Sequence, residues 1–172
     1  TALPITHDPD VREPGSFSMR GHSVGGYGSV TTNKVIATIA GEVFGMDVQA
    51  YPKYGSEKKG LPTTYYLTVA DGPIRTHAEL DRVDMVPLHD VSAFALGDPL
   101  AGLVDGGQLF IQSRLTDPDG IWASIPSHAR AQILARLCWA LKREDRFAES
   151  EGMALDLRAL AEQLGDEEHR VE

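Results

Sequence analysis

Apolar and polar positions form short runs over the first two thirds of the chain and take on a helical spacing afterwards. Short apolar runs bounded by turn residues predict strands at 16–24, 47–51, 65–69, 85–88 and 108–112, the last of them after a turn at Asp105-Gly106-Gly107. Longer apolar-rich segments predict a helix at 30–44, a short helix at 76–83 capped by Thr76, and partial helix at 94–104. Strands that alternate with helices predict an α/β protein, a three-layer α/β/α domain with a mainly parallel sheet.

The last third of the chain has a helical pattern. Ser127 can cap a helix that ends near Arg143, and apolar residues recur on one of its faces at Ile133, Leu134, Leu137, Cys138 and Leu141. A second helix is predicted at 153–164, where Gly165 is a typical stop. The organisation predicted is an N-terminal arm or linker at 1–15, an α/β domain at 16–125 and a C-terminal helical extension at 126–172.

The segment with the most chemical content is Gly25-Gly26-Tyr27-Gly28, which directly precedes the first predicted helix. Three glycines within four residues let the backbone bend sharply and let a ligand approach it closely. A glycine loop that opens a helix also presents unpaired N–H groups and the positive end of the helix dipole, which suit a phosphate or a carboxylate. The alternative is a tight strand-to-helix turn without a ligand, and the loop alone leaves both interpretations open.

Two common nucleotide sites fit this loop poorly. The dinucleotide fingerprint requires a third glycine where the chain has Thr31, and an acidic residue at the end of the next strand, whereas Asp47 starts that strand. No Gly-Lys-Ser/Thr follows the glycines, as a phosphate-binding loop of ATPases would require. The strand at 47–51 runs instead into the one basic cluster of the chain, which contains Lys53, Lys58 and Lys59 with Tyr51 and Tyr54 between them. This cluster favours an anionic ligand, and its alternative is a solvated loop.

Composition narrows the function further. The net charge of −9 argues against a general nucleic-acid surface. Cys138 is the only cysteine, so a four-cysteine iron–sulfur site within the chain is impossible, and its apolar surroundings favour a buried thiol. No apolar run approaches the roughly 20 residues that cross a bilayer, and no secretory signal precedes residue 18. We therefore expect a cytoplasmic protein without membrane or nucleic-acid partners.

Histidines and hydroxyls give weaker signals. The six histidines include no pair at metal-ligand spacing, so no metal site is predicted. His22 and His89 lie at the ends of predicted strands, where ligands gather in α/β sheets, although surface or hydrogen-bonded histidines are the favoured interpretation. Ser29, Thr31 and Thr32 have no recognisable His-Asp partners, which disfavours a self-contained hydrolase.

Several motifs occur in a characteristic order. The glycine loop with Asn33-Lys34 is followed by Tyr54-Gly55-Ser56-Glu57-Lys58-Lys59-Gly60, then Asp71-Gly72-Pro73-Ile74, then Gly106-Gly107-Gln108. Over residues 19–113 this series resembles the gamma subunit, or gamma domain, of the 2-oxoacid:ferredoxin (acceptor) oxidoreductases. Many gamma subunits have Arg-Gly in place of Lys59-Gly60, and the small-residue C-terminal helix of the family is not recognisable after Ser113.

The resemblance implies that 16–125 is a gamma-type catalytic-accessory domain of a thiamine diphosphate-dependent enzyme (EC 1.2.7-like). Such enzymes convert a 2-oxoacid to acyl-CoA and CO2 and pass the electrons to ferredoxin or another acceptor. The resemblance also implies that alpha, beta and ferredoxin-like (delta) subunits hold the thiamine diphosphate and the [4Fe-4S] clusters. This chain would then carry no catalytic residue and would help to bind coenzyme A. The coenzyme A site implied consists of Gly25, Gly26, Gly28, Ser29, Thr31, Asn33, Tyr54, Lys58 and Lys59.

Two alternatives from other classes stay open, a stand-alone nucleotide or coenzyme A binding module and a purely structural subunit. The identity of the 2-oxoacid and the use of coenzyme A also stay open, because this chain is expected to form only a minor wall of the substrate pocket.

Overall fold

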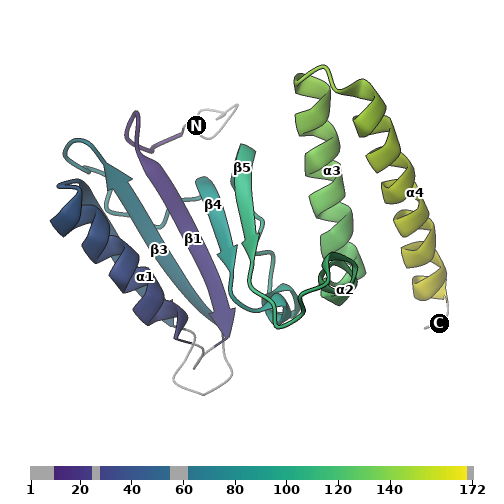
Figure 1. The fold of residues 1–172 in the computed structure, drawn as a ribbon, viewed down its shortest axis with the longest axis horizontal. Coiled ribbons are helices and arrows are strands. Elements are labelled where there is room, and N and C mark those ends of the chain that lie inside the picture. Colours follow the sequence, from purple (N-terminus) through teal and green to yellow (C-terminus); the bar gives the residue numbers. More distant parts are fainter. Residues whose placement is uncertain (1–9, 25–27, 55–61, 170–172) are drawn as a thin grey trace, which may run out of the picture. The chain divides into compact units, whose positions relative to one another are not determined.

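The computed structural model describes residues 10–24, 28–54 and 62–169. Its elements fall into two compact units, Thr1–Gln112 and Ser113–Glu172 (Figure 1). The first unit contains β1 (Phe17–Val24), α1 (Ser29–Thr38) with a π-helical last turn (Ile39–Val43), β2 (Asp47–Tyr54), β3 (Pro62–Ala70), β4 (Val83–Leu88), a 3-10 helix (Val91–Ala95) and β5 (Leu103–Ile111). The second contains α2 (Pro118–Ser124), α3 (Ser127–Arg143) and α4 (Phe147–His169).

The first unit is built on a five-stranded sheet with the order β2-β3-β1-β4-β5. The pairs β2/β3 and β3/β1 are antiparallel, whereas β1/β4 and β4/β5 are parallel. The predicted α/β class is confirmed, and the sheet is mixed. In its parallel half the carboxyl ends of β1, β4 and β5 meet at one edge, which is where open α/β sheets bind ligands.

One face of this sheet is covered by α1 (Figure 1). Side chains alternate between the two faces of a strand, so Met19 of β1 and Tyr65 and Leu67 of β3 all point toward the helix. These three residues are buried and form a core to which Val30 and Ala37 of α1 add partly buried contacts. Burial of such side chains stabilises the fold by about 1.5–3 kcal/mol each. The helix that starts at the glycine loop is thereby held rigidly on the sheet.

On the opposite face, the N-terminal segment is tied to the sheet through Asp84 of β4. The Asp84 carboxylate accepts hydrogen bonds from the backbone N–H and the hydroxyl of Ser18, at 2.8 and 3.0 Å, and pairs with Arg12 at 2.5 Å. Ser18 is fully buried, so these bonds satisfy polar atoms that would otherwise destabilise the interior.

Two local predictions are wrong. No helix forms at 76–83, because the Thr76 hydroxyl donates to the carbonyl of Val11 at 2.9 Å instead of capping a turn. The Gly106-Gly107 turn lies inside β5 as a bulge, since Val83 pairs with Leu103 whereas Met85 pairs with Gln108. Gly106 takes a φ of 76° there, which a glycine adopts readily.

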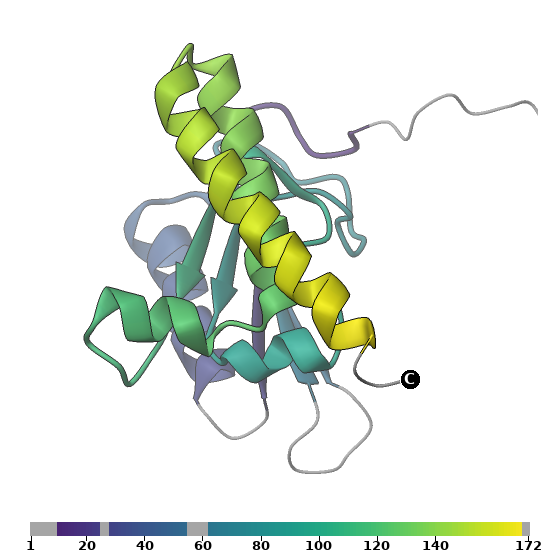
Figure 2. The same ribbon diagram turned by 90° about the vertical axis from the view of Figure 1, so that its right-hand side faces the viewer.

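The second unit is a helical hairpin in which α3 and α4 pack side by side (Figures 1 and 2). The predicted helix at 127–143 is confirmed, but Ser127 is its first residue and does not cap it, because Pro126 occupies the cap position. The helix predicted at 153–164 forms the central part of the longer α4, which continues past the expected stop at Gly165 to His169. The two helices are linked by a reciprocal contact of buried residues. The Cys138 thiol approaches the carbonyl of Ser150 at 3.7 Å, and the Ser150 hydroxyl donates to the carbonyl of Cys138 at 3.1 Å. Within the described ranges, none of the helices combines the length and apolar character that a membrane span requires.

Candidate functional site

The N-terminus of α1 has no side-chain cap among the described residues. Gly28 occupies the cap position with φ 75° and ψ 2°, a left-handed conformation that follows from its lack of a side chain. No side chain caps this helix and no acidic residue lies in its first turn. Because the first N–H groups of a helix have no partner inside it, the backbone at residues 29–31 can donate to an anion.

Asn33 adds an unusual feature one turn further along α1. Its side chain is only 1% exposed, yet neither Oδ1 nor Nδ2 has a hydrogen-bond partner in the described part of the chain. Leaving a buried polar group unpaired costs about 1–3 kcal/mol. Because the unpaired amide of Asn33 destabilises the fold, its presence indicates a role other than stabilising the fold.

The side chains of Asn33 and His89 both lie over Gly21 of β1. A Cβ at Gly21 would come within 3.1 Å of Asn33 Nδ2, so a larger residue would displace this amide, whereas its distance of 3.8 Å from His89 Nε2 is an ordinary contact. The other ring nitrogen of His89, Nδ1, lies 3.0 Å from Oε1 of Gln112. In the neutral ring Nδ1 then carries the proton, and Nε2, which is buried and has no partner among the described residues, presents a lone pair.

The parallel strands position these groups at their carboxyl ends. His89 follows β4 and its N–H donates to the carbonyl of His22 in β1 at 2.8 Å, while Gln112 follows β5 and donates to the carbonyl of Leu88 at 2.9 Å. The site therefore combines an open helix start with an unpaired amide and an imidazole acceptor. The N–H donors at the helix start suit an anion, whereas the imidazole acceptor suits a group that donates a hydrogen bond. Among the described residues, no group of three or more His, Cys, Asp or Glu could hold a metal ion.

His22 lies beside this edge on the opposite face of β1 from Gly21. Burial, with the nearby positive charge of Arg20, lowers the pKa of His22 from 6.5 to about 4. The ring is therefore neutral at physiological pH, and its buried Nε2 has no partner among the described residues.

Comparison with known proteins connects this arrangement to a family. The family profile described as "Pyruvate ferredoxin/flavodoxin oxidoreductase" matches residues 18–171, which is nearly the whole chain. The chain belongs to this family. The match also extends through the C-terminal helices, in which no family feature is recognisable from the sequence.

Two relatives that carry the same subunit name each match more than half of this chain. The pyruvate/ketoisovalerate oxidoreductases common subunit gamma of Thermococcus litoralis is 35% identical over 100 residues, 58% of this chain and 54% of the relative. The protein of the same name from Thermococcus kodakarensis is 36% identical over 97 residues, 56% and 52% of the two chains. This chain thus spans about half the length of the curated relatives it matches.

A solved structure shares the fold. The crystal structure of the pyruvate oxidoreductase subunit PORC from Thermotoga maritima aligns with a TM-score of 0.50 and 18% identity, over 86% of this chain and 96% of that one. At this identity the likeness establishes the fold alone.

The site residues that the family resemblance implies fall into three groups. Gly28, Ser29, Thr31 and Asn33 lie together on the cap and first turns of α1, where Ser29 is buried and Thr31 is exposed. Tyr54 ends β2 opposite Thr63. Gly25, Gly26, Lys58 and Lys59 lie outside the described residues.

The basic cluster identified in the sequence is partly neutralised in the fold. Lys53 pairs with Glu79 at 2.7 Å, and this hydrogen bond raises the pKa of the lysine. Both side chains are about half exposed, so solvent screens the pair and it adds little to the stability of the fold. Lys53 therefore offers less net charge to an anion than its position in the sequence suggests.

Gln112 and Gly21 are the site residues that sequence reasoning missed. Gln112 is the last residue of the strand predicted at 108–112, which is the only sequence signal for it. Gly21 has no sequence signal, because its importance comes from the helix packed over it.

Replacing Asn33 with leucine is expected to stabilise the protein by about 1–2 kcal/mol, because the branched side chain keeps the shape of the amide and removes two unpaired polar atoms. The urea midpoint of unfolding measures this. The control is Thr31→Leu, an exposed change on the same helix, which is expected to alter stability by about 0.5 kcal/mol or less. If Asn33→Leu destabilises the protein, the amide makes hydrogen bonds in the free protein, which would contradict the prediction.

Proposed function

We propose that this chain is the gamma component of a multi-subunit, thiamine diphosphate-dependent 2-oxoacid:acceptor oxidoreductase, and that it shapes the active site and helps to bind coenzyme A. Family membership supports the enzyme class. The relatives from Thermococcus carry the name of a gamma subunit common to pyruvate and ketoisovalerate oxidoreductases, which favours a 2-oxoacid as substrate.

The observation that carries the coenzyme A assignment is the start of α1, where Gly28 occupies the cap position and no side chain of the described residues caps the helix. Coenzyme A carries a pyrophosphate and a 3′-phosphate, and a helix N-terminus stabilises such groups through its free N–H donors and its dipole. We assign the phosphates to the loop and first turn at 25–31, and to Lys58 and Lys59 as point charges. Tyr54 would present a flat apolar surface to the adenine or the pantetheine arm.

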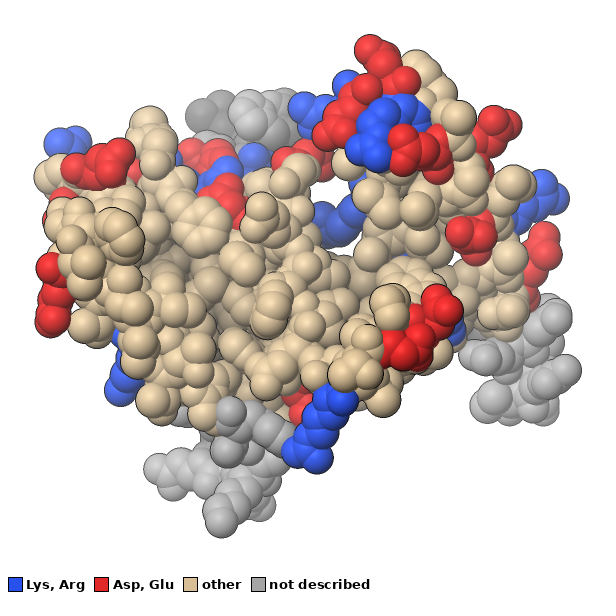
Figure 3. Space-filling view, viewed as in Figure 1, with Lys and Arg blue, Asp and Glu red and all other residues tan. Residues whose placement is uncertain are grey.

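An exposed apolar stripe supports the proposal that alpha, beta and ferredoxin-like subunits surround this chain. Val35, Ile36, Ile39, Val43 and Phe44 lie on α1 and its last turn and are between 42% and 72% exposed. Figure 3 shows that charged side chains are sparse over the side of the first unit that faces the viewer. Contiguous exposed apolar surface of this kind is typical of a face that a protein partner covers.

Thiamine diphosphate and iron–sulfur clusters, held by the partner chains, would supply the decarboxylation and electron-transfer chemistry. The residues of this chain would bind and orient coenzyme A. With a single cysteine, the chain cannot provide four thiolates for a cluster of its own.

The double substitution Lys58→Ala/Lys59→Ala, in the complex reconstituted with its partner subunits, tests the proposal. We expect the apparent KM for coenzyme A to rise about tenfold, because two charge-assisted contacts with phosphate are lost. The KM for the 2-oxoacid should stay unchanged. Lys142→Ala, an exposed lysine of α3, is the matched control.

Each alternative has its own outcome in this experiment. An unchanged KM for coenzyme A in an intact complex would refute the coenzyme A assignment and favour a purely structural subunit. Binding of coenzyme A by the isolated chain, at the affinity of the complex, would favour a stand-alone binding module.

A further inference from the structure

The helical unit contains a cavity of its own, with a volume of about 540 Å³, between α2, α3 and α4. Trp122 of α2, Ile133, Leu134 and Leu137 of α3, and Leu160 of α4 form most of its apolar wall. Pockets that bind small organic molecules have volumes of roughly 300–1,000 Å³ and combine apolar walls with a few polar groups. All the residues that line this cavity lie after Ser113, so it is separate from the site at α1.

Arg130 brings a positive charge into this apolar cavity. One terminal nitrogen of its guanidinium donates to the hydroxyl of Ser127 at 3.1 Å. Its Nε is buried and has no hydrogen-bond partner in the part of the chain that the structure describes. A guanidinium has five N–H donors arranged to grip a carboxylate, and its attraction for an anion is strengthened where water is excluded.

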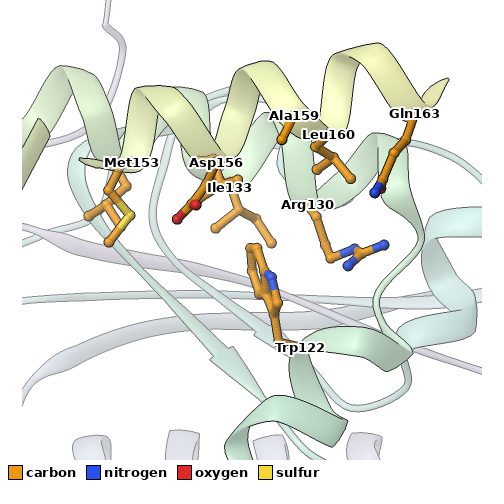
Figure 4. Close-up of a pocket in the computed structure, with 10 residues that line it drawn as sticks. Trp122, Arg130, Ile133, Met153, Asp156, Ala159, Leu160 and Gln163 are labelled. Carbon is orange, nitrogen blue, oxygen red and sulfur yellow. The ribbon is translucent and has the colours of Figure 1, made fainter. Parts of the chain in front are cut away.

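The other polar groups of the cavity make its two ends differ in charge. Figure 4 shows the amide of Gln163 on the same side of Trp122 as the Arg130 guanidinium, and the carboxylate of Asp156 on the other side. A negative charge is thus favoured at the end with Arg130 and disfavoured at the end with Asp156. The indole of Trp122 lies between the two ends and offers a flat apolar surface to the body of a ligand.

We propose that this cavity is a binding site for a small amphipathic carboxylate. The carboxylate accepts hydrogen bonds from the Arg130 guanidinium and from the Gln163 amide, and the apolar body of the ligand lies against Trp122 and Ile133. The site is independent of the proposed role in coenzyme A binding, because it uses a different unit of the chain and different residues.

Binding of the fluorescent anion 8-anilinonaphthalene-1-sulfonate to the full chain tests the proposal, because the probe joins an aromatic body to a negative group. We expect saturable binding that Arg130→Gln weakens about tenfold, equivalent to about 1.4 kcal/mol. Arg136→Gln, which changes an exposed arginine of the same helix outside the cavity, should leave the affinity unchanged. Decanoate should displace the probe, whereas decan-1-ol at the same concentration should not.

A second variant tests the same cavity independently, in case Arg130→Gln fails to fold. Ala159→Trp places a large side chain on the cavity wall without a change of charge and is expected to reduce probe binding equally. Three results would each overturn the proposal: no saturable binding, equal affinities for the Arg130 and Arg136 variants, or displacement by decan-1-ol as efficient as by decanoate.

Discussion

Replacement of Gly102 by alanine is expected to destabilise the sheet unit by about 4 kcal/mol or more, the range of the most damaging single substitutions. Gly102 adopts a φ of 72°, and a Cβ there would overlap the carbonyl oxygen of Asp81 and lie 2.7 Å from its carbonyl carbon. Both obstacles are backbone atoms, so no side-chain rotation can relieve the contact. The carbonyl of Gly102 also accepts from the N–H of Val83 at 3.0 Å, where the pairing of β4 with β5 begins. Relief of the overlap would therefore break the start of that pairing.

Gly106 provides the matched control for this substitution. It has nearly the same φ, 76°, but a Cβ there would meet no heavy atom within 4 Å. Gly106→Ala should therefore cost only the strain of a left-handed residue, about 1–2 kcal/mol. Chemical denaturation followed by circular dichroism measures both free energies of unfolding. If both variants lose the same free energy of unfolding, the backbone near Asp81 can shift away from the new Cβ at little cost, which would contradict the prediction.

Acidification from pH 6.5 to pH 4 is expected to remove on the order of 3 kcal/mol of stability through His22 alone. Its pKa is about 4 in the folded protein, mainly through burial and secondarily through Arg20, against 6.5 as the ordinary value. Between these values the unfolded chain binds a proton that the folded chain does not, so stability rises with pH. The full contribution of the neutral ring is present above pH 6.5 and is lost as the pH falls to 4.

Urea denaturation at several pH values, for the parent protein and for His22→Asn, measures this effect. The variant should show a much flatter dependence between pH 6.5 and 4, and His77→Asn, which changes an exposed histidine, should keep the parent profile. Asp10 titrates in a lower range, because the hydrogen bond from Arg12 lowers its pKa to about 2. A parent profile that is already flat would show that the ring is solvated or paired.

The elements that could be predicted from the sequence are those fixed by local patterns. Alternation defines β1 and β3, and the apolar spacing after Ser127 defines α3 from its first residue to its last. Thr76 is a counterexample, since a contact with Val11, 65 residues away, takes the hydroxyl that was expected to cap a helix. The bulge at Gly106 also depends on a partner strand, so the glycines alone predict a turn instead.

The candidate site also has one part that local sequence predicts and another part that depends on long-range contacts. The glycine loop and the helix that follows it are adjacent in the chain, so their arrangement at Gly28 could be predicted from residue types. The position of His89 beside Asn33 depends on two parallel strand pairings and on the absence of a side chain at Gly21, none of which a local pattern encodes. The ion pair of Lys53 with Glu79 is likewise a long-range contact, which the sequence does not predict.

The single cysteine gives the helical hairpin an internal reporter. Cys138 is 7% exposed and contacts Ser150 across the two helices, so a thiol reagent reaches it only when α3 and α4 separate. No other thiol exists in the chain. The rate of its modification therefore measures the opening of this hairpin alone, and the stability of one unit can be followed while the sheet unit stays folded.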